Sequence, residues 1–268
     1  MSDTTGIQWT DATWNPLRGC SAVSPGCANC YAAAVAYRFS QKGQPYEGLA
    51  KQSSAGKPIW TGKVVDVPAH MNDPIKWHRK PRRIFVNSMS DLFHEAVSDD
   101  IILKIFDVMQ RAPNHTYQCL TKRAGRMQAF MQKHFATAHL PQVWLGVSVE
   151  NQACADERIP LLMATPGVSV RWLSCEPLLG HVDLSSFSQN PPDWVVVGGE
   201  SGPRSRPMEL GWALDIAAWT RANGKALFMK QLGEDLAKRR EATTKKGDAL
   251  DDFPGLLRRR EFPTAQGF

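Results

Sequence analysis

Short apolar runs alternate with amphipathic stretches along most of the chain. Seven of these runs have the length of strands, are rich in β-branched and aromatic residues, and end at polar or turn-forming residues. They cover residues 7–15, 84–89, 115–121, 143–149, 170–176, 193–200 and 225–231. We therefore predict seven strands, several of them buried.

Stretches with helical periodicity lie between these strands. They cover residues 31–39, 99–110, 124–134, 151–164 and 209–223. Asn151 is suited to cap the fourth helix, and Gly224 to end the fifth. Short strands that alternate with helices of ten to fifteen residues predict right-handed βαβ units and a parallel sheet.

The expected fold class is α/β, a partial or nearly closed parallel (β/α) barrel of about six to seven strands. The alternative is a doubly wound open sheet, which usually has a glycine-rich phosphate turn after its first strand, where this chain has cysteines. We expect the barrel to span residues 1–235, with an irregular insertion at about 41–70. Residues 236–268 are expected to form a polar, poorly ordered tail.

Composition limits the class of protein. The 268 residues are 43% apolar, enough for a large core, and no stretch approaches the ~20 apolar residues of a membrane span. The first residues lack the basic and apolar regions of a signal peptide. Six cysteines, three of them close together, are not a disulfide scaffold and indicate a reducing compartment. We expect a cytoplasmic protein that does not bind membranes.

Three cysteines, Cys20, Cys27 and Cys30, lie within eleven residues. Three thiolates from one loop favour a metal or cluster site, and three rather than four leave one coordination position open for a ligand. A 4Fe–4S cluster is the preferred interpretation. The alternatives are a structural zinc completed by a distant histidine, or three unrelated thiols.

Each predicted strand stops at a polar cluster. In a parallel barrel these ends form one rim, where active sites are built, so the clusters together predict a polar ligand-binding mouth. The rim residues considered as catalytic candidates are Cys175, Glu176, Lys122 and Lys230. Taken singly, each such residue is as well explained by a helix cap or a turn.

The formal net charge is +6 and the isoelectric point is near 9.1, which weakly favours an anionic partner. The densest basic block surrounds Trp77 and consists of Lys76, Arg79, Lys80, Arg82 and Arg83. Basic residues around an aromatic ring suit a nucleic acid, since they can hold phosphates while the ring stacks on a base. A solvated helix end is the plain alternative.

The cysteine loop resembles that of the radical SAM superfamily, whose three cysteines follow the first strand of a partial barrel and hold a 4Fe–4S cluster. Two departures exist: six residues separate Cys20 from Cys27 where the superfamily has three, and Asn29 replaces an aromatic residue. Over nearly its full length the chain looks like a narrower group, the phage- and prophage-associated three-cysteine-motif proteins classed as radical-SAM-like. The segments that resemble it are WTDATWNPLRGC, CANCYA, VSVEN, SCEPLLG, VVVGGESG and FMKQLG.

The resemblance implies an enzyme that cleaves S-adenosylmethionine at the cluster and abstracts hydrogen from a substrate. It implies an electron donor such as a flavodoxin or ferredoxin, and a nucleic-acid base or nucleotide in phage DNA is the favoured substrate. By position, the residues that would bind S-adenosylmethionine are Ser88, Ser90, Asp91, Glu150, Asn151, Glu176, Gly198, Gly199 and Glu200. The rival hypothesis is a zinc-stabilised nucleic-acid-binding protein without catalysis.

Overall fold

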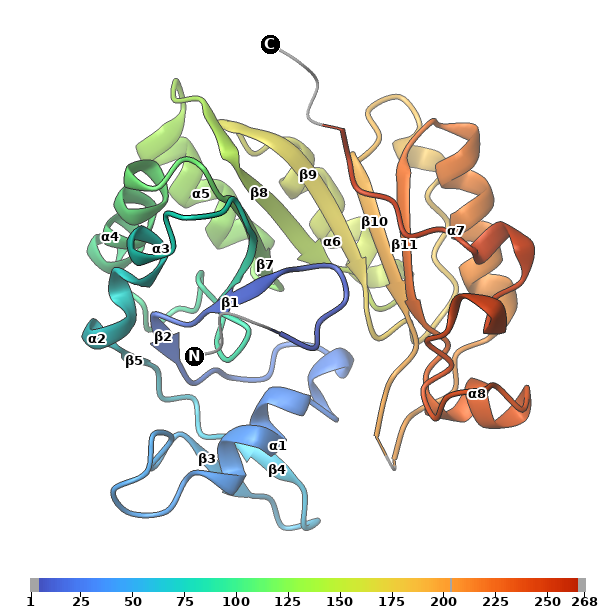
Figure 1. Cartoon of the computed structure of the whole chain (residues 1–268), viewed down its shortest axis with the longest axis horizontal. Coiled ribbons are helices and arrows are strands. Elements are labelled where there is room, and N and C mark those ends of the chain that lie inside the picture. Colours follow the sequence, from blue (N-terminus) through green and yellow to red (C-terminus); the bar gives the residue numbers. More distant parts are fainter. Residues whose placement is uncertain (1–4, 203, 265–268) are drawn as a thin grey trace. The chain divides into compact units, whose positions relative to one another are not determined.

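The computed structural model describes residues 5–202 and 204–264. Its main sheet has seven strands, β1 (Ala12–Trp14), β6 (Arg83–Val86), β7 (Thr116–Thr121), β8 (Leu140–Ser148), β9 (Val168–Cys175), β10 (Trp194–Gly198) and β11 (Ala226–Gln231). They are adjacent in that order, which is the order of the sequence (Figure 1). The order never reverses, as it would in a doubly wound sheet. The predicted fold class, a partial parallel (β/α) barrel, is confirmed.

The helices between the strands also match the sequence pattern. They are α1 (Tyr31–Arg38), α4 (Asp99–Arg111), α5 (Ala124–Phe135), α6 (Gln152–Met163) and α7 (Leu210–Ala222). Asn151 caps α6 as predicted, since its side chain accepts a hydrogen bond from the Cys154 amide at 3.0 Å. Gly224 follows α7 with a φ of +63°, the left-handed conformation expected of a helix stop.

The chain divides into two compact units, Met1–Trp144 with Pro166–Val168, and Leu145–Thr165 with Ser169–Phe268. In the first unit β1, β6 and β7 pair in parallel, and the core includes a group of phenylalanines from α4 and α5. In the second unit β9, β10 and β11 pair in parallel around Trp172 and Trp194, whose ring centroids are 5.2 Å apart. Each unit therefore has its own aromatic core.

The predicted insertion at 41–70 is more regular than expected. It contains the antiparallel hairpin of β3 (Ala50–Gln52) and β4 (Pro58–Trp60), which lies beside α1 in Figure 1, and β5 (Val65–Asp66), which pairs with β2 (Leu17–Arg18). Two short helices follow, α2 (Pro68–Met71) and α3 (Asp73–Lys76). The strands are too short for their polar–apolar alternation to be recognised in the sequence.

The expectation of a poorly ordered tail is wrong for the described residues 236–264. They contain the end of α8 (Glu234–Arg239) and the single-turn helices Leu250–Asp252 and Gly255–Leu257. Phe253 and Leu257 are buried. Arg260 forms an antiparallel bridge with Phe228 of β11, and the Arg259 carbonyl accepts the Met229 amide at 2.8 Å. A few well-spaced apolar side chains are enough to anchor this basic segment, because its arginine stems also cover apolar surface.

Two remaining single-turn helices are Pro25–Cys27 and Ser185–Phe187. Throughout the part of the chain that the structure describes, no helix combines the length and the apolar character needed to cross a bilayer.

Candidate functional site

The cysteine loop begins just after β2 in the first unit. Gly19 forms a parallel bridge with Ser90 and has a φ of +95°. A Cβ at this position would lie 2.1 Å from the Lys63 carbonyl oxygen, so only glycine fits here. The loop then makes the single turn Pro25–Cys27 and reaches Cys30, the N-terminal flanking residue of α1. The loop is therefore held at both ends.

The three thiols of this loop are free, partly exposed and directed at different neighbours. The Cys20 Sγ lies 3.4 Å from the Ser21 carbonyl, and the Cys27 Sγ lies 4.0 Å from the Ser24 hydroxyl. Cys30 packs against the small apolar cluster that includes Ala32, Ala36 and Met89. Among residues 5–202 and 204–264, no three His, Cys, Asp or Glu side chains are placed so that they could hold a metal ion.

Burial raises the pKa of the Cys20 thiol to about 12, and the nearby Asp91 carboxylate and Cys30 add to the rise. The Arg123 guanidinium acts in the opposite direction. Cys20 and Cys30 are thus close enough to affect each other electrostatically. A cation that bound between them would stabilise the thiolate forms that burial disfavours.

Arg123 is the electrostatic centre of this region. It follows β7, its side chain is only 5% exposed, and its Nη1 is 2.9 Å from the Asp91 carboxylate. Its Nη2 donates to the Ser21 hydroxyl at 2.8 Å, and its Nη1 lies 4.0 Å from the Cys20 Sγ. Burial alone would lower the pKa of Arg123, but the Asp91 and Glu95 carboxylates raise it, so the residue is a fixed cation beside the loop.

The Ser21 hydroxyl has a second donor. The His94 Nδ1 accepts the Ala96 amide at 3.1 Å, and burial lowers the pKa of His94, so the neutral ring carries its proton on Nε2. That Nε2 lies 2.8 Å from the Ser21 Oγ and donates to it. Because the Ser21 oxygen accepts from both His94 and Arg123, its own hydrogen is available as a donor within the cysteine loop.

The predicted cofactor ligands of the first unit all take part in internal contacts. The Ser88 hydroxyl donates to the Asn15 side chain at 3.1 Å, and the Ser90 hydroxyl to the Leu17 carbonyl at 3.3 Å. Asp91 accepts the Thr121 hydroxyl at 2.7 Å and the Phe93 amide at 2.9 Å, in addition to Arg123. The backbone amide of Lys122, a predicted catalytic candidate, also donates to Asp91, at 3.3 Å.

In the second unit, three predicted carboxylates stand at the ends of neighbouring strands, each with a basic partner. Glu150 lies 2.9 Å from Arg158, Glu176 lies 2.9 Å from Lys230, and Glu200 lies 2.6 Å from Arg206. The structure brings them near one another: Glu200, and then Glu150, raise the pKa of Arg206, while burial raises the pKa of Cys175 with contributions from Glu176 and Glu150.

These carboxylates differ in their access to solvent. The side chains of Glu150 and Glu200 are 0% and 5% exposed, whereas Glu176 and its partner Lys230 are 14% and 26% exposed. A buried carboxylate that already has an ion-pair partner cannot exchange it for a ligand without a large desolvation cost. The Glu176–Lys230 pair is therefore the most accessible of the three.

The Gly198–Gly199 pair is explained by packing. A Cβ on Gly199 would lie 2.1 Å from the Leu232 carbonyl oxygen, and one on Gly198 would lie 2.9 Å from the Glu176 carboxylate. The Gly199 amide donates to the Gln231 carbonyl at 3.0 Å, and the Gly199 carbonyl accepts the Gln231 side chain at 2.8 Å. Both residues thus allow β10 and β11 to approach closely where they end.

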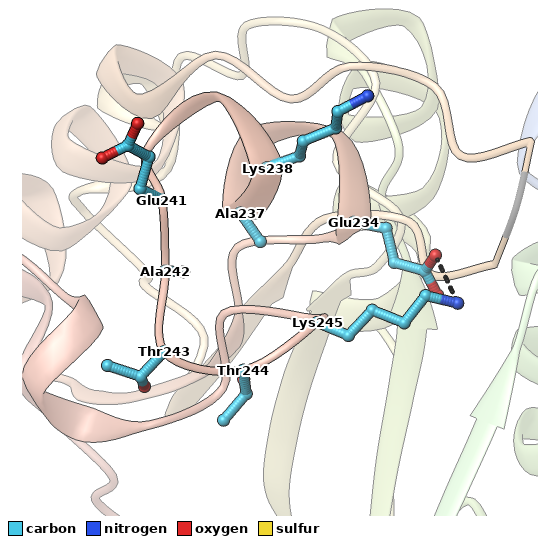
Figure 2. A pocket seen from close by; sticks show the side chains of 8 residues that line it. All are labelled: Glu234, Ala237, Lys238, Glu241, Ala242, Thr243, Thr244 and Lys245. Atoms are coloured by element: carbon cyan, nitrogen blue, oxygen red, sulfur yellow. Dashed lines mark ion pairs between the residues drawn. The ribbon is translucent and has the colours of Figure 1, made fainter.

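A cavity of about 350 Å³ lies beside α8 in the second unit (Figure 2). Its lining includes Glu234 and Lys245, which form an ion pair at 3.2 Å, and Thr243 and Thr244, which bond to Asp252 and Asp248. None of the residues predicted as a site lines it. Because its polar side chains already bond to one another or to neighbours, it offers no evident catalytic group.

The sequence pattern led to Lys122 as a rim candidate and missed its neighbour Arg123. Both stand at the same strand end, and the sequence contains no signal that separates them. His94 was missed for a similar reason, since its contact with Ser21 joins positions 73 residues apart. Their roles depend on long-range contacts that only the folded chain reveals.

Replacement of Arg123 by alanine should lower the free energy of unfolding by roughly 3–5 kcal/mol, because the buried Asp91 carboxylate loses its partner. Arg123→Lys should cost less, since it keeps the charge but loses the planar fork. Urea unfolding followed by circular dichroism measures both. The control is Arg111→Ala, whose exposed pair with Asp107 is worth no more than about 0.5 kcal/mol. A loss for Arg123→Ala no larger than that of the control would contradict this role.

Comparison with known proteins adds a family but no activity. No curated protein and no solved structure matches the chain. A family model described as "Protein of unknown function (DUF5131)" matches residues 4–254, which is most of the sequence. The chain therefore belongs to the DUF5131 family.

Proposed function

We propose that the protein is an iron–sulfur enzyme of the radical SAM type, with a 4Fe–4S cluster bound by Cys20, Cys27 and Cys30. The observation that carries the proposal is the three free thiols in one anchored loop, beside the fixed cation Arg123. Three thiolates leave one iron without a protein ligand, and that iron is where a small molecule binds.

The donor set suits this cluster in chemistry, although its side chains are not preformed around one point. None of the three cysteines is in a disulfide, and all three are partly exposed. The first turn of α1, where Cys30 is the flanking residue, has no side-chain cap, so backbone amides there are available to a negatively charged group. The loop must draw the three thiols together when the cluster assembles.

When bound, such a cluster supplies the single electron that cleaves S-adenosylmethionine, and the protein orients the reactants and excludes water. In the first unit, Arg123 offsets the negative charge of the thiolates, and the Ser21 hydroxyl is a hydrogen-bond donor beside Cys20. In the second unit, Glu176 and Lys230 are the charged side chains best placed by exposure to meet the polar groups of S-adenosylmethionine. Glu150 and Asn151 have structural partners and are less suited to that role.

Anaerobic reconstitution with iron and sulfide should give a brown protein with about four irons per chain. The triple variant Cys20→Ala, Cys27→Ala and Cys30→Ala should bind none, whereas Cys154→Ala, a control outside the loop, should match the wild type. Iron and sulfide assays with visible absorption spectra measure this. Stoichiometric zinc that remains bound after reconstitution would instead support the zinc-stabilised alternative.

The double variant Glu176→Ala and Lys230→Ala should weaken S-adenosylmethionine binding to the reconstituted protein by several-fold or more, since each hydrogen bond removed is worth about 1 kcal/mol. Isothermal titration calorimetry measures the affinity. The matched control is Glu209→Ala with Arg239→Ala, an exposed ion pair of the same unit. Equal affinities of the two double variants would remove Glu176 and Lys230 from the binding site.

We further propose a nucleic-acid base or nucleotide as the substrate, supported by the basic block around Trp77. Arg79 and Lys80 are exposed, and the Arg82 guanidinium lies 5.4 Å from the centre of the Trp77 ring. Other members of the block have structural partners: Lys76 pairs with Asp73, and Arg83 pairs with Asp11 at 2.8 Å. The phosphate-binding part of the block is thus reduced to Arg79, Lys80 and Arg82.

Changing Arg79, Lys80 and Arg82 together to glutamine should lower the affinity for DNA or RNA and flatten its salt dependence. Removing one cation from a phosphate reduces the slope of log affinity against log salt by about 0.7–0.9. Fluorescence anisotropy over a salt series measures it. The control changes the same number of exposed charges, with Lys238, Arg240 and Lys246 replaced by glutamine. An unchanged slope, or no binding by the wild type at low salt, would exclude this role for the block.

A further inference from the structure

Helix α1 has an exposed apolar stripe beside the cysteine loop. It consists of Tyr31, Val35 and Phe39, the last of which directly follows the helix, and these side chains are 55%, 36% and 48% exposed. They are spaced four residues apart and so lie on one helix face. Val23, within the cysteine loop, is also 44% exposed. We refer to Tyr31, Val35 and Phe39 as the α1 stripe.

The opposite face of α1 is already in use. Ala32, Ala33 and Ala36 are buried there, and the cluster that includes Ala32 and Ala36 also contains Ala50 of β3 and Met89. The Tyr31 hydroxyl donates to the Ser88 carbonyl at 3.1 Å, which fixes the start of the helix. The α1 stripe is therefore held outward by a packed face behind it and is not a core surface in search of its own hairpin.

The surroundings of the α1 stripe are basic. No charged residue lies between Arg18 and Arg38, so the cysteine loop and most of α1 are uncharged. Residues 17–66, which contain the loop, α1 and its hairpin, have six Lys or Arg against two Asp or Glu, a net +4 of the chain's +6. The Lys57 ammonium lies 3.2 Å from the Asn29 side chain, which places one of these cations at the cysteine loop itself.

An apolar centre within a basic region is complementary to an acidic protein surface that has an apolar centre of its own. A second copy of this chain is disfavoured, because two regions of net +4 repel each other. A nucleic acid would use the basic residues and leave Val35 and Phe39 without a role.

We propose that the α1 stripe is the docking surface for an acidic, single-electron carrier protein that reduces the cluster. This inference rests on the proposed function, which needs an electron that the chain cannot supply. The α1 stripe begins at the residue after Cys30, so a protein bound there lies beside the cluster loop. Electron-transfer complexes bury little surface, usually under about 1,200 Å², and a stripe of three large side chains suits that size.

The test compares reduction of the reconstituted protein by reduced flavodoxin and by dithionite, in stopped-flow absorption. The variant Val35→Glu with Phe39→Glu adds two negative charges to exposed positions and should slow reduction by flavodoxin at least about tenfold. Reduction by dithionite, a small reductant that needs no docking, should be unchanged. The control variant, Val65→Glu with Leu250→Glu, adds the same charge at two other exposed apolar residues and should reduce at the wild-type rate.

Added salt should slow reduction of the wild type by flavodoxin, since the attraction is electrostatic. Equal flavodoxin rates for the stripe variant and the control would overturn the docking surface while leaving the cluster proposal intact. A chain that assembles no cluster would overturn both. Stripe-dependent binding to anionic phosphatidylglycerol vesicles, or stripe-dependent self-association in sedimentation, without an effect on the flavodoxin rate, would assign the surface to a membrane or to a second copy and overturn the inference.

Discussion

The buried ion pair between Arg123 and Asp91 holds the first unit's candidate site together. Asp91 follows β6, Arg123 follows β7, and the guanidinium continues to Ser21 in the cysteine loop. Two charges removed from water are costly, and this cost is offset only where hydrogen bonds satisfy both groups. Asp91 meets that condition with a hydroxyl and two amides besides Arg123. The position of the cysteine loop is thus tied to the ends of two strands.

The second unit uses the same device three times. Glu150, Glu176 and Glu200 each follow a strand, and each is neutralised by a cation of its own unit. Pairing within the protein explains why so many charged residues can stand at strand ends without unsatisfied charge. It also means that a polar rim is not by itself a binding surface. The exposure of each pair decides which one is available to a ligand, and by this criterion Glu176 and Lys230 differ from Glu150 and Arg158.

Much of the fold was predictable because its signals are local. All seven strands of the main sheet and the five helices between them coincide with periodic runs, and Asn151 and Gly224 mark helix ends by their own chemistry. The tail was predicted wrongly because its order comes from a few apolar residues such as Phe253 and Leu257, which composition alone outweighs. Partners at the site were not predictable, since Asp91 and Arg123 are 32 residues apart.

The distribution of charge around the cysteine loop has a physical logic. The segment between Arg18 and Arg38 has no charged side chain of its own, so it can fold closely around a group of either sign. The compensating charge comes instead from Arg123, on a rigid strand end, and from basic residues of the neighbouring hairpin. A fixed cation held by carboxylates stabilises negative charge on the thiolates without having to reorganise when that charge appears. An uncharged loop beside a preorganised cation is therefore suited to a group whose charge changes during its reaction.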